Sequence, residues 1–193
     1  MALMLDLKRT AVLAMDLQND IVNATPGIGE KKVLANIRQV LDRARQQQVA
    51  VVHITVSFRG DYRDAPGASP LFQMVRQNGM LRAGTAGAEI HADVRPQEGE
   101  PVLNKTCVDP FLTTNLDQLL HNLDANTLVL MGLWTNFVVE ATARHASDLG
   151  YRVIVVRECC ASNSDENHTF ALTQILPMVA TVAGLDEVLP ALA

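Results

Sequence analysis

Short apolar runs that alternate with stretches of helical period are the feature that most constrains the fold of this chain. The run at residues 49–56 is almost continuously apolar, which is typical of a strand buried on both faces of a parallel sheet. Five more runs of strand length lie at residues 10–15, 101–105, 126–131, 151–156 and 179–182. Helical patterns lie between them at 33–44, 114–123, 135–149 and 165–176. This alternation predicts a three-layer, Rossmann-like α/β sandwich with a mostly parallel six-stranded sheet.

Residues 57–99 interrupt this regular pattern. Glycine and proline punctuate the segment, and it favours one short helix, near residues 71–76. Its apolar side chains still have to be buried: Phe72, Met74, Leu81 and Ile90. So long an irregular insertion in a compact domain is typically functional or packs against another subunit. The length of 193 residues predicts a single domain over 1–193.

Composition and charge argue against several classes of partner. Sixteen basic and 21 acidic side chains give a net charge of −5, and only 4% of residues are aromatic, so we expect no nucleic-acid partner. The first ten residues lack a signal-peptide pattern, and no run of about 18 apolar residues predicts a membrane span. Three cysteines, two of them adjacent, form no disulfide framework. Reduced thiols and a cytoplasmic location are the expectation.

Polar residues follow three of the predicted strands. Asp16 closes the first, Lys105 closes the third, and residues 132–136 join the fourth to its helix. Because ligands bind beyond the carboxyl ends of parallel strands, these features are expected to share one site. A buried carboxylate beside an ammonium can serve as an acid or base. By position alone, turn chemistry for Asp16 and a solvated Lys105 remain open.

Several ordered motifs resemble the isochorismatase-like, or cysteine hydrolase, family. They are AVLAMDLQND, GTAGAEIHADVRPQEGEPVLNK, KTCVDPFLTTNLDQLL, GLWTNFVVEATARHASDLGYRVIVV and ECCASNSDENHTFAL, between about residues 10 and 176. The resemblance implies that Asp16 is the general acid/base and Lys105 its charged partner. It also implies a non-proline cis peptide within residues 133–135, with backbone N–H groups turned inward as an oxyanion hole. Residues expected at the substrate pocket are Gln18, Phe111, Trp134, Thr135 and Phe137, with core packing the alternative for Trp134 and Phe137.

One position departs from the family pattern. Amidase members read T-N-x-C-V-E-x-T-A, whereas residues 135–143 here read TNFVVEATA, so Val138 occupies the place of the nucleophilic cysteine. An isopropyl group cannot attack a carbonyl, which closes the thioester route. The neighbouring motif residues stay in register, so the substitution is genuine.

Three interpretations follow. The chain resembles the isochorismatase branch, in which an aspartate protonates an enol-ether carbon, with Arg59, Arg63 and Arg82 as candidate carboxylate clamps or simply solvated side chains. Alternatively, the thiol of Cys107 or Cys159 replaces the missing nucleophile, although buried cysteines are common as small hydrophobes. In the third, the protein has lost hydrolysis and binds a small molecule or acts as a scaffold.

Other titratable residues are interpreted structurally. We expect His53 to be a core histidine with one backbone partner, and His145 and His168 to have structural roles. Asp61 and Asp64 lack a histidine pair, so no metal and no cofactor are predicted.

Two local features of helices are also predicted. Ser162 and Asp165 have capping-box spacing, and Glu140 and Arg144 are spaced for a helix ion pair. Together, the sequence predicts a hydrolase for a small polar metabolite, or else a binding protein, that assembles as a dimer or larger homo-oligomer.

Overall fold

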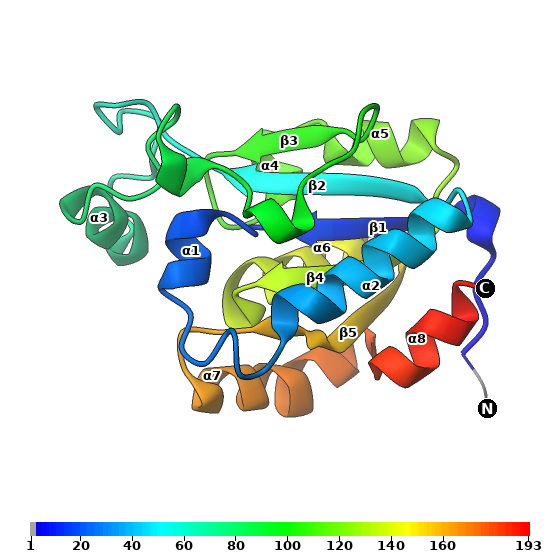
Figure 1. Ribbon diagram of the computed structural model, residues 1–193. Helices are drawn as coiled ribbons and strands as arrows, with labels where there is room; N and C mark the ends of the chain where they lie inside the picture. The colour runs from blue at the N-terminus through cyan, green and yellow to red at the C-terminus, as the bar shows by residue number, and fades with distance from the viewer. Residues whose placement is uncertain (1–2) are drawn as a thin grey trace.

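A computed structural model describes residues 3–193 as a six-stranded parallel sheet between two layers of helices (Figure 1). The strands are β1 (Thr10–Met15), β2 (Ala50–Val56), β3 (Val102–Lys105), β4 (Thr127–Leu133), β5 (Arg152–Ala161) and β6 (Thr181–Ala183). They lie in the order β3-β2-β1-β4-β5-β6, and every adjacent pair is parallel. The predicted sandwich is therefore confirmed. The single domain predicted over 1–193 includes residues 1 and 2, which lie outside the described part, and it stays a prediction.

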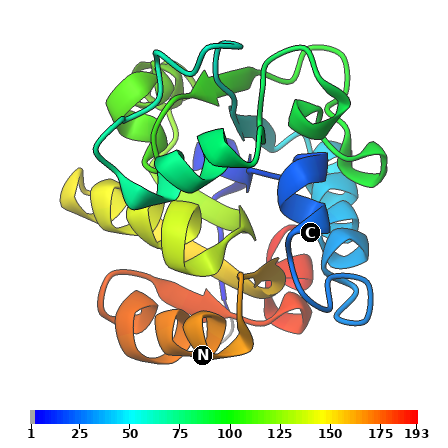
Figure 2. The same cartoon turned by 90° about the vertical axis from the view of Figure 1, so that its left-hand side faces the viewer.

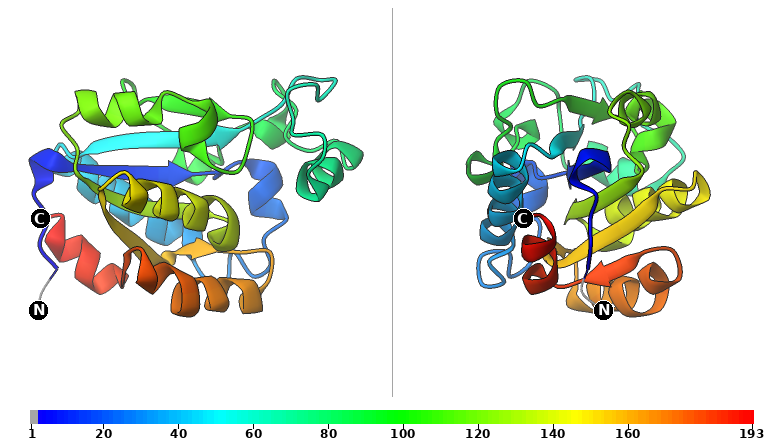
Figure 3. Two further views of the ribbon diagram at one scale, coloured as in Figure 1. Left: turned by 180° about the vertical axis from the view of Figure 1, so that it is seen from behind. Right: turned by 90° about the vertical axis from the view of Figure 1, so that its right-hand side faces the viewer.

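Helices cover both faces of the sheet. They are α1 (Asn19–Asn23), α2 (Val33–Gln46), α3 (Pro70–Gln77), α4 (Pro110–Thr113), α5 (Leu116–Asn122), α6 (Glu140–Asp148), α7 (Asp165–Phe170) and α8 (Leu185–Ala191). Apolar residues of α2 and α8 pack on one face, and those of α5 and α6 on the other (Figures 1 and 3). The central strand β1 sends Val12 and Ala14 to the first core and Leu13 and Met15 to the second, as the two-residue period of a strand requires.

β5 is longer than its sequence pattern predicts. The pattern ends at Val156 because two charged residues follow, yet the strand continues to Ala161. Its register against β4 shifts where Leu130 pairs with Val155 and Gly132 pairs with Cys160. Arg157 and Glu158 lie in the irregular stretch between these two pairs, and regular pairing with β4 resumes at Cys160. The strand predicted to end at residue 156 is therefore too short, and Cys159, which the prediction places beyond it, lies inside β5.

Both long helices predicted in the second half are composite. Residues Thr135–Val139 form a π-helical turn before α6, and Ala171–Ile175 form another after α7. The predicted capping box at Ser162 is also wrong. Ser164 caps α7 instead, and its Oγ accepts from the N–H of Asn167 at 3.2 Å. The pattern predicts neither α1 nor α8, since five and seven residues are too few to show a helical period.

The irregular segment folds over one end of the sheet. Its helix α3 forms where the sequence predicts one, and short 3₁₀ turns follow at Ala86–Ala88 and Ala92–Val94. Figure 2 looks onto this end, where α1, α3 and the surrounding loops lie in front of the strands. Within residues 3–193, no helix is both long enough and apolar enough to cross a membrane.

Candidate active site

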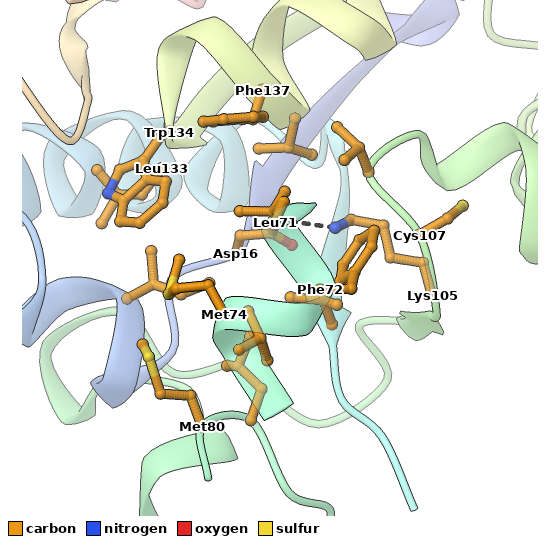
Figure 4. A pocket seen from close by; sticks show the side chains of 16 residues that line it. Asp16, Leu71, Phe72, Met74, Met80, Lys105, Cys107, Leu133, Trp134 and Phe137 are labelled. Carbon is orange, nitrogen blue, oxygen red and sulfur yellow. Dashed lines mark hydrogen bonds and ion pairs between the residues drawn. The ribbon is translucent and has the colours of Figure 1, made fainter. Parts of the chain in front are cut away.

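A pocket with about 520 Å³ of space, part of it open to solvent, lies at the carboxyl ends of β1 to β4. Strand ends supply Asp16, Lys105 and Leu133, and the turn before α6 supplies Trp134 and Phe137 (Figure 4). The remaining wall comes mainly from α3 and the loop after it. The pocket therefore lies at the sheet edge where parallel strands place ligands.

Asp16 and Lys105 form a buried ion pair in this pocket. Lys105 Nζ lies 2.8 Å from Asp16 Oδ2, and the two side chains are 2% and 8% exposed. Because β2 separates their strands, their backbones are two strand spacings, or about 10 Å, apart. A long side chain is needed to bridge that span, and lysine provides one. The ion pair thus joins residues 89 positions apart in the sequence.

The other carboxylate oxygen of Asp16 has no hydrogen-bond partner. Among residues 3–193, Oδ1 is the one buried side-chain nitrogen or oxygen left without a partner. Burial raises the pKa of the Asp16 carboxyl above its ordinary value, against the opposing charge and hydrogen bond of Lys105. A carboxyl group with one oxygen held and the other free can exchange a proton with a bound molecule.

The backbone at Asp16 directs this carboxyl group. Its φ of 55° lies in the left-handed region, which aspartate tolerates better than most residues. Its N–H donates to the carbonyl oxygen of Ile54 at 2.9 Å, which fixes the turn to the end of β2. Strained conformations of this kind are common at functional sites.

Val138 lies in the pocket wall and is 1% exposed. It belongs to the apolar core under α6, so its side chain packs and excludes water. The predicted cis peptide is present between Leu133 and Trp134. The carbonyl oxygen of Trp134 accepts from the N–H groups of Phe137 at 3.0 Å and Val139 at 3.5 Å. Those two N–H groups are therefore already bonded within the turn, so the oxyanion hole expected here does not come from them.

Trp134 and Phe137 form one side of the pocket, and their ring centroids lie 5.9 Å apart. The indole nitrogen of Trp134 donates to Thr25 Oγ1 at 2.8 Å. Because that N–H is already bonded, the indole ring presents carbon atoms to the pocket (Figure 4). Both residues line the pocket, as expected, but through apolar contact.

Gln18 does not line the pocket. Its side chain is fully buried, and Nε2 donates to the carbonyl oxygens of Val56 and Ala88, each at 2.8 Å. Its Oε1 accepts from the N–H of Val56, also at 2.8 Å. The adjacent Asn19 and Asp20 bind the backbone of Ala86 and Leu81 in the same way. The polar run after Asp16 therefore fastens the irregular segment to the strand ends.

Phe111 and Thr135 also lie outside the pocket lining. Phe111 packs against the imidazole of His145, with centroids 4.7 Å apart, and His145 Nδ1 lies 2.6 Å from Asp109 Oδ2. Thr135 Oγ1 donates to a carbonyl oxygen of β5 at 3.1 Å and lies 2.8 Å from His168 Nδ1. Burial lowers the pKa of His168, which favours the neutral ring. Both histidines thus make structural contacts.

The cysteines offered as substitute nucleophiles lie in unsuitable surroundings. Cys159 is fully buried in β5, and burial raises the pKa of its thiol. Cys107 lines the pocket, but its sulfur donates to the carbonyl oxygen of Asp109 at 3.1 Å. In Figure 4 that sulfur points away from Asp16. Neither arrangement activates a thiol.

The structure corrects the expected partner of His53 and agrees with the solvated alternative for the candidate arginines. His53 binds Glu100 Oε2 at 3.0 Å, so its partner is a side chain rather than the backbone. The candidate arginine clamps do not line the pocket: Arg59 and Arg63 lie beside Asp61 at 3.7 and 3.3 Å.

The helix pair between Glu140 and Arg144 forms as predicted, at 2.9 Å. In the described part of the chain, no three His, Cys, Asp or Glu side chains are grouped to hold a metal ion. The predicted lack of a metal stays a prediction.

The apolar wall opposite Trp134 is not predicted from the sequence. Leu71, Phe72 and Met74 of α3 and Met80 after it line this side (Figure 4). The available signal is the apolar spacing within 71–75, which marks a face that must be buried. It does not identify whether the buried face meets the core or a cavity.

Comparisons with known proteins agree with this arrangement. The sequence matches the family described as "Isochorismatase domain" over residues 10–187. An uncharacterized isochorismatase family protein of Bacillus subtilis, YwoC, is 29% identical and covers 96% of this chain and 95% of its own. The ureidoacrylate amidohydrolase RutB of Rhizobium rhizogenes is 30% identical over 77% of this chain and 69% of its own. The structure of an isochorismatase family protein from Burkholderia thailandensis superimposes with a TM-score of 0.86 at 28% identity, covering 100% and 99% of the two chains.

Proposed function

Because the chain belongs to the isochorismatase family of hydrolases, we propose that it hydrolyses a small metabolite at Asp16 and Lys105 without a cysteine nucleophile. The observation that carries the proposal is the carboxyl group of Asp16, which belongs to a residue lining the pocket and whose Oδ1 has no hydrogen-bond partner among residues 3–193. The opposite oxygen is held by Lys105, so the reactive oxygen is fixed in position. The side chain of Val138 shapes the pocket wall and excludes water, and it takes no part in the reaction.

Two bond types fit such a site. For an enol ether, protonated Asp16 donates its proton to the terminal vinyl carbon, and the ether oxygen stabilises the resulting cation. Water then adds to the cationic carbon and returns a proton to Asp16. The hemiketal that forms breaks its carbon–oxygen bond to give an alcohol and a carbonyl compound. The raised pKa of Asp16 supports this route because the acid form is needed first.

For a carbon–nitrogen bond, as the name of RutB indicates for that relative, ionised Asp16 takes a proton from water. The water attacks the carbonyl carbon directly, and the same proton passes to the leaving nitrogen. Lys105 stabilises the carboxylate through its charge and hydrogen bond. No covalent intermediate forms, because Val138 has no nucleophilic atom.

The proposal is tested with isochorismate and a panel of small amides, using the wild-type chain, Asp16→Asn and Asp148→Asn. Asp148 is exposed on α6 outside the pocket and serves as the matched control. Turnover is expected to fall by about 10²–10⁴-fold in Asp16→Asn and to stay unchanged in the control. If Asp16→Asn remains folded and fully active, the proposal is wrong. If no substrate turns over while a small ligand raises the melting temperature, the chain is a binding protein.

A further inference from the structure

The pocket presents very little polarity to a ligand. Of the 16 residues that line it, the charged ones within the described chain are Asp16 and Lys105, and their charges cancel when Asp16 is ionised. The Cys107 thiol donates to the carbonyl oxygen of Asp109 and the Trp134 indole N–H donates to Thr25 Oγ1, so neither donor is left for a ligand. Among the buried side-chain nitrogen and oxygen atoms of residues 3–193, Asp16 Oδ1 is the one without a hydrogen-bond partner.

The charge balance of the pocket disfavours anions. An anionic substrate would enter without a free counterion, since Lys105, the one cation among the described residues that line the cavity, is already paired with Asp16. Arg59 and Arg63 are 73% and 86% exposed and lie beside Asp61 instead. Burying an uncompensated charge is costly. A dicarboxylate would double that cost.

The walls favour an apolar ligand. Trp134 and Phe137 lie on one side, and Phe72, Met74 and Met80 come from the segment opposite (Figure 4). Aromatic rings supply large apolar contact areas, and methionine side chains adapt to ligands of different shape. Affinity should therefore grow with the apolar area that a ligand buries.

We propose that this pocket selects an uncharged substrate with an apolar body, alkyl or aromatic, that carries one polar reacting group directed at Asp16. The inference rests on the proposed function for the statement that this group reacts. It narrows the predicted small polar metabolite to one whose polarity is confined to that group. Met74, which is 37% exposed at the pocket wall, is a specificity-determining residue.

Binding is measured by titration calorimetry with propanamide, butanamide, pentanamide, hexanamide, hexanoate and adipate. A carboxamide both donates and accepts hydrogen bonds, so it fits either protonation state of Asp16. Each added methylene is expected to tighten Kd by about fourfold until the pocket is filled. Adipate is expected to bind at least about 100-fold more weakly than hexanamide. Equal affinity for adipate, no dependence on chain length, or no binding by the whole series would overturn the inference.

A pair of variants tests the wall directly. Met74→Lys adds a cation to the pocket, so it should weaken hexanamide binding and strengthen hexanoate binding. Met178→Lys makes the same change at a side chain that is 83% exposed and outside the pocket, and it should alter neither. If both variants behave alike, Met74 does not determine specificity and the inference fails.

The experiments distinguish failure of the proposed hydrolysis from failure of the proposed ligand class. Chain-length-dependent binding without hydrolysis of any compound would refute the proposed function and leave the ligand class intact. Turnover of a charged substrate that depends on Asp16, with no binding of the neutral amides, would refute the ligand class and leave the proposed function intact.

Discussion

Asp16 combines three conditions at one residue: a left-handed backbone, burial, and a bond to Lys105 through a single oxygen. The backbone turn at the end of β1 directs the carboxyl group into the pocket rather than along the sheet. Burial favours the protonated form, and Lys105 favours the ionised form. A residue balanced between the two forms suits proton transfer, whereas an exposed aspartate at the same position would stay ionised.

At the residue scale, we predict that Val138→Cys gains acyl-transfer activity. The new thiol would replace a pocket-lining isopropyl group beside Asp16, which can accept its proton. The change in unfolding free energy should be small, about 0.5–1.5 kcal/mol, because cysteine packs as a small hydrophobe. Mass spectrometry after incubation with an activated ester or amide should detect a covalent adduct at position 138.

Val139→Cys is the matched control for that experiment. Val139 is equally buried and adjacent in the sequence, but it does not line the pocket. An adduct of equal yield at position 139 would show that general thiol reactivity explains the result. Failure of Val138→Cys to react, in a folded protein, would mean that the surrounding groups no longer support amidase chemistry.

At the scale of elements, the polar residues 18–20 that follow β1 hold the irregular segment between β2 and β3 in place. Gln18 fills three backbone hydrogen-bonding positions on Val56 and Ala88, and Asp20 binds the N–H of Leu81. Gly87 has no room for a side chain, because an added Cβ would lie 2.4 Å or less from the carboxylate of Asp20. The wall of the pocket is thus attached to the strand that carries Asp16.

We predict that Gln18→Ala loosens this wall. Removing the amide leaves a buried N–H and two carbonyl groups without their partner, at a cost on the order of 1–3 kcal/mol. Hydrogen exchange should accelerate most in residues 80–91. Gln39→Ala, at an exposed site on α2, should change the unfolding free energy by less than about 0.5 kcal/mol. Equal exchange rates in wild-type and Gln18→Ala chains would show that Gln18 is not the anchor.

At the scale of the whole molecule, a partly buried ionic network joins the sheet to its helical layer. Glu100, just before β3, accepts from Arg45 of α2 at 2.7 Å and lies 3.0 Å from His53 of β2. Burial alone would raise the pKa of Glu100, but hydrogen bonds from Arg45, the Gln97 backbone and His53 lower it to about 2. Burial lowers the pKa of His53 because it disfavours the charged ring, although Glu100 opposes this effect.

Both shifts predict that acid weakens the fold. The contribution of Glu100 is fully present above its unfolded pKa, near 4.5, and is lost as pH falls toward 2. Glu100→Gln should flatten the pH dependence of the unfolding free energy in this window by about 1–2 kcal/mol, allowing for solvent screening. Urea denaturation at several pH values measures it. The exposed Glu98→Gln should follow the wild-type curve, and a Glu100→Gln curve parallel to wild type would contradict the prediction.

Contacts within one chain do not test how the protein assembles or where it is located in the cell. Phe72 and Leu81 belong to the irregular segment that is expected to be functional or to pack against another subunit, and they are 7% and 4% exposed within the chain itself. Their burial in the pocket wall already accounts for their apolar character. The dimer or larger assembly and the cytoplasmic location therefore stay predictions.

The sequence by itself determined the three-layer sandwich with its parallel six-stranded sheet, and the placement of Asp16 and Lys105 at strand ends. These properties follow from local periodicity and from the geometry of parallel strands, which a linear pattern records directly. Even the loss of the nucleophile is readable, because Val138 lies within a motif that stays in register.

Only the tertiary structure decided what each polar or apolar residue contacts. A buried glutamine that anchors a loop and one that binds substrate look alike in sequence, and Gln18 proved to be the first. The apolar spacing within 71–75 likewise fits core packing or a pocket wall. These roles depend on contacts between residues about 40 to 90 positions apart, as with Gln18 and Val56 or Asp16 and Lys105, and local patterns carry no record of them.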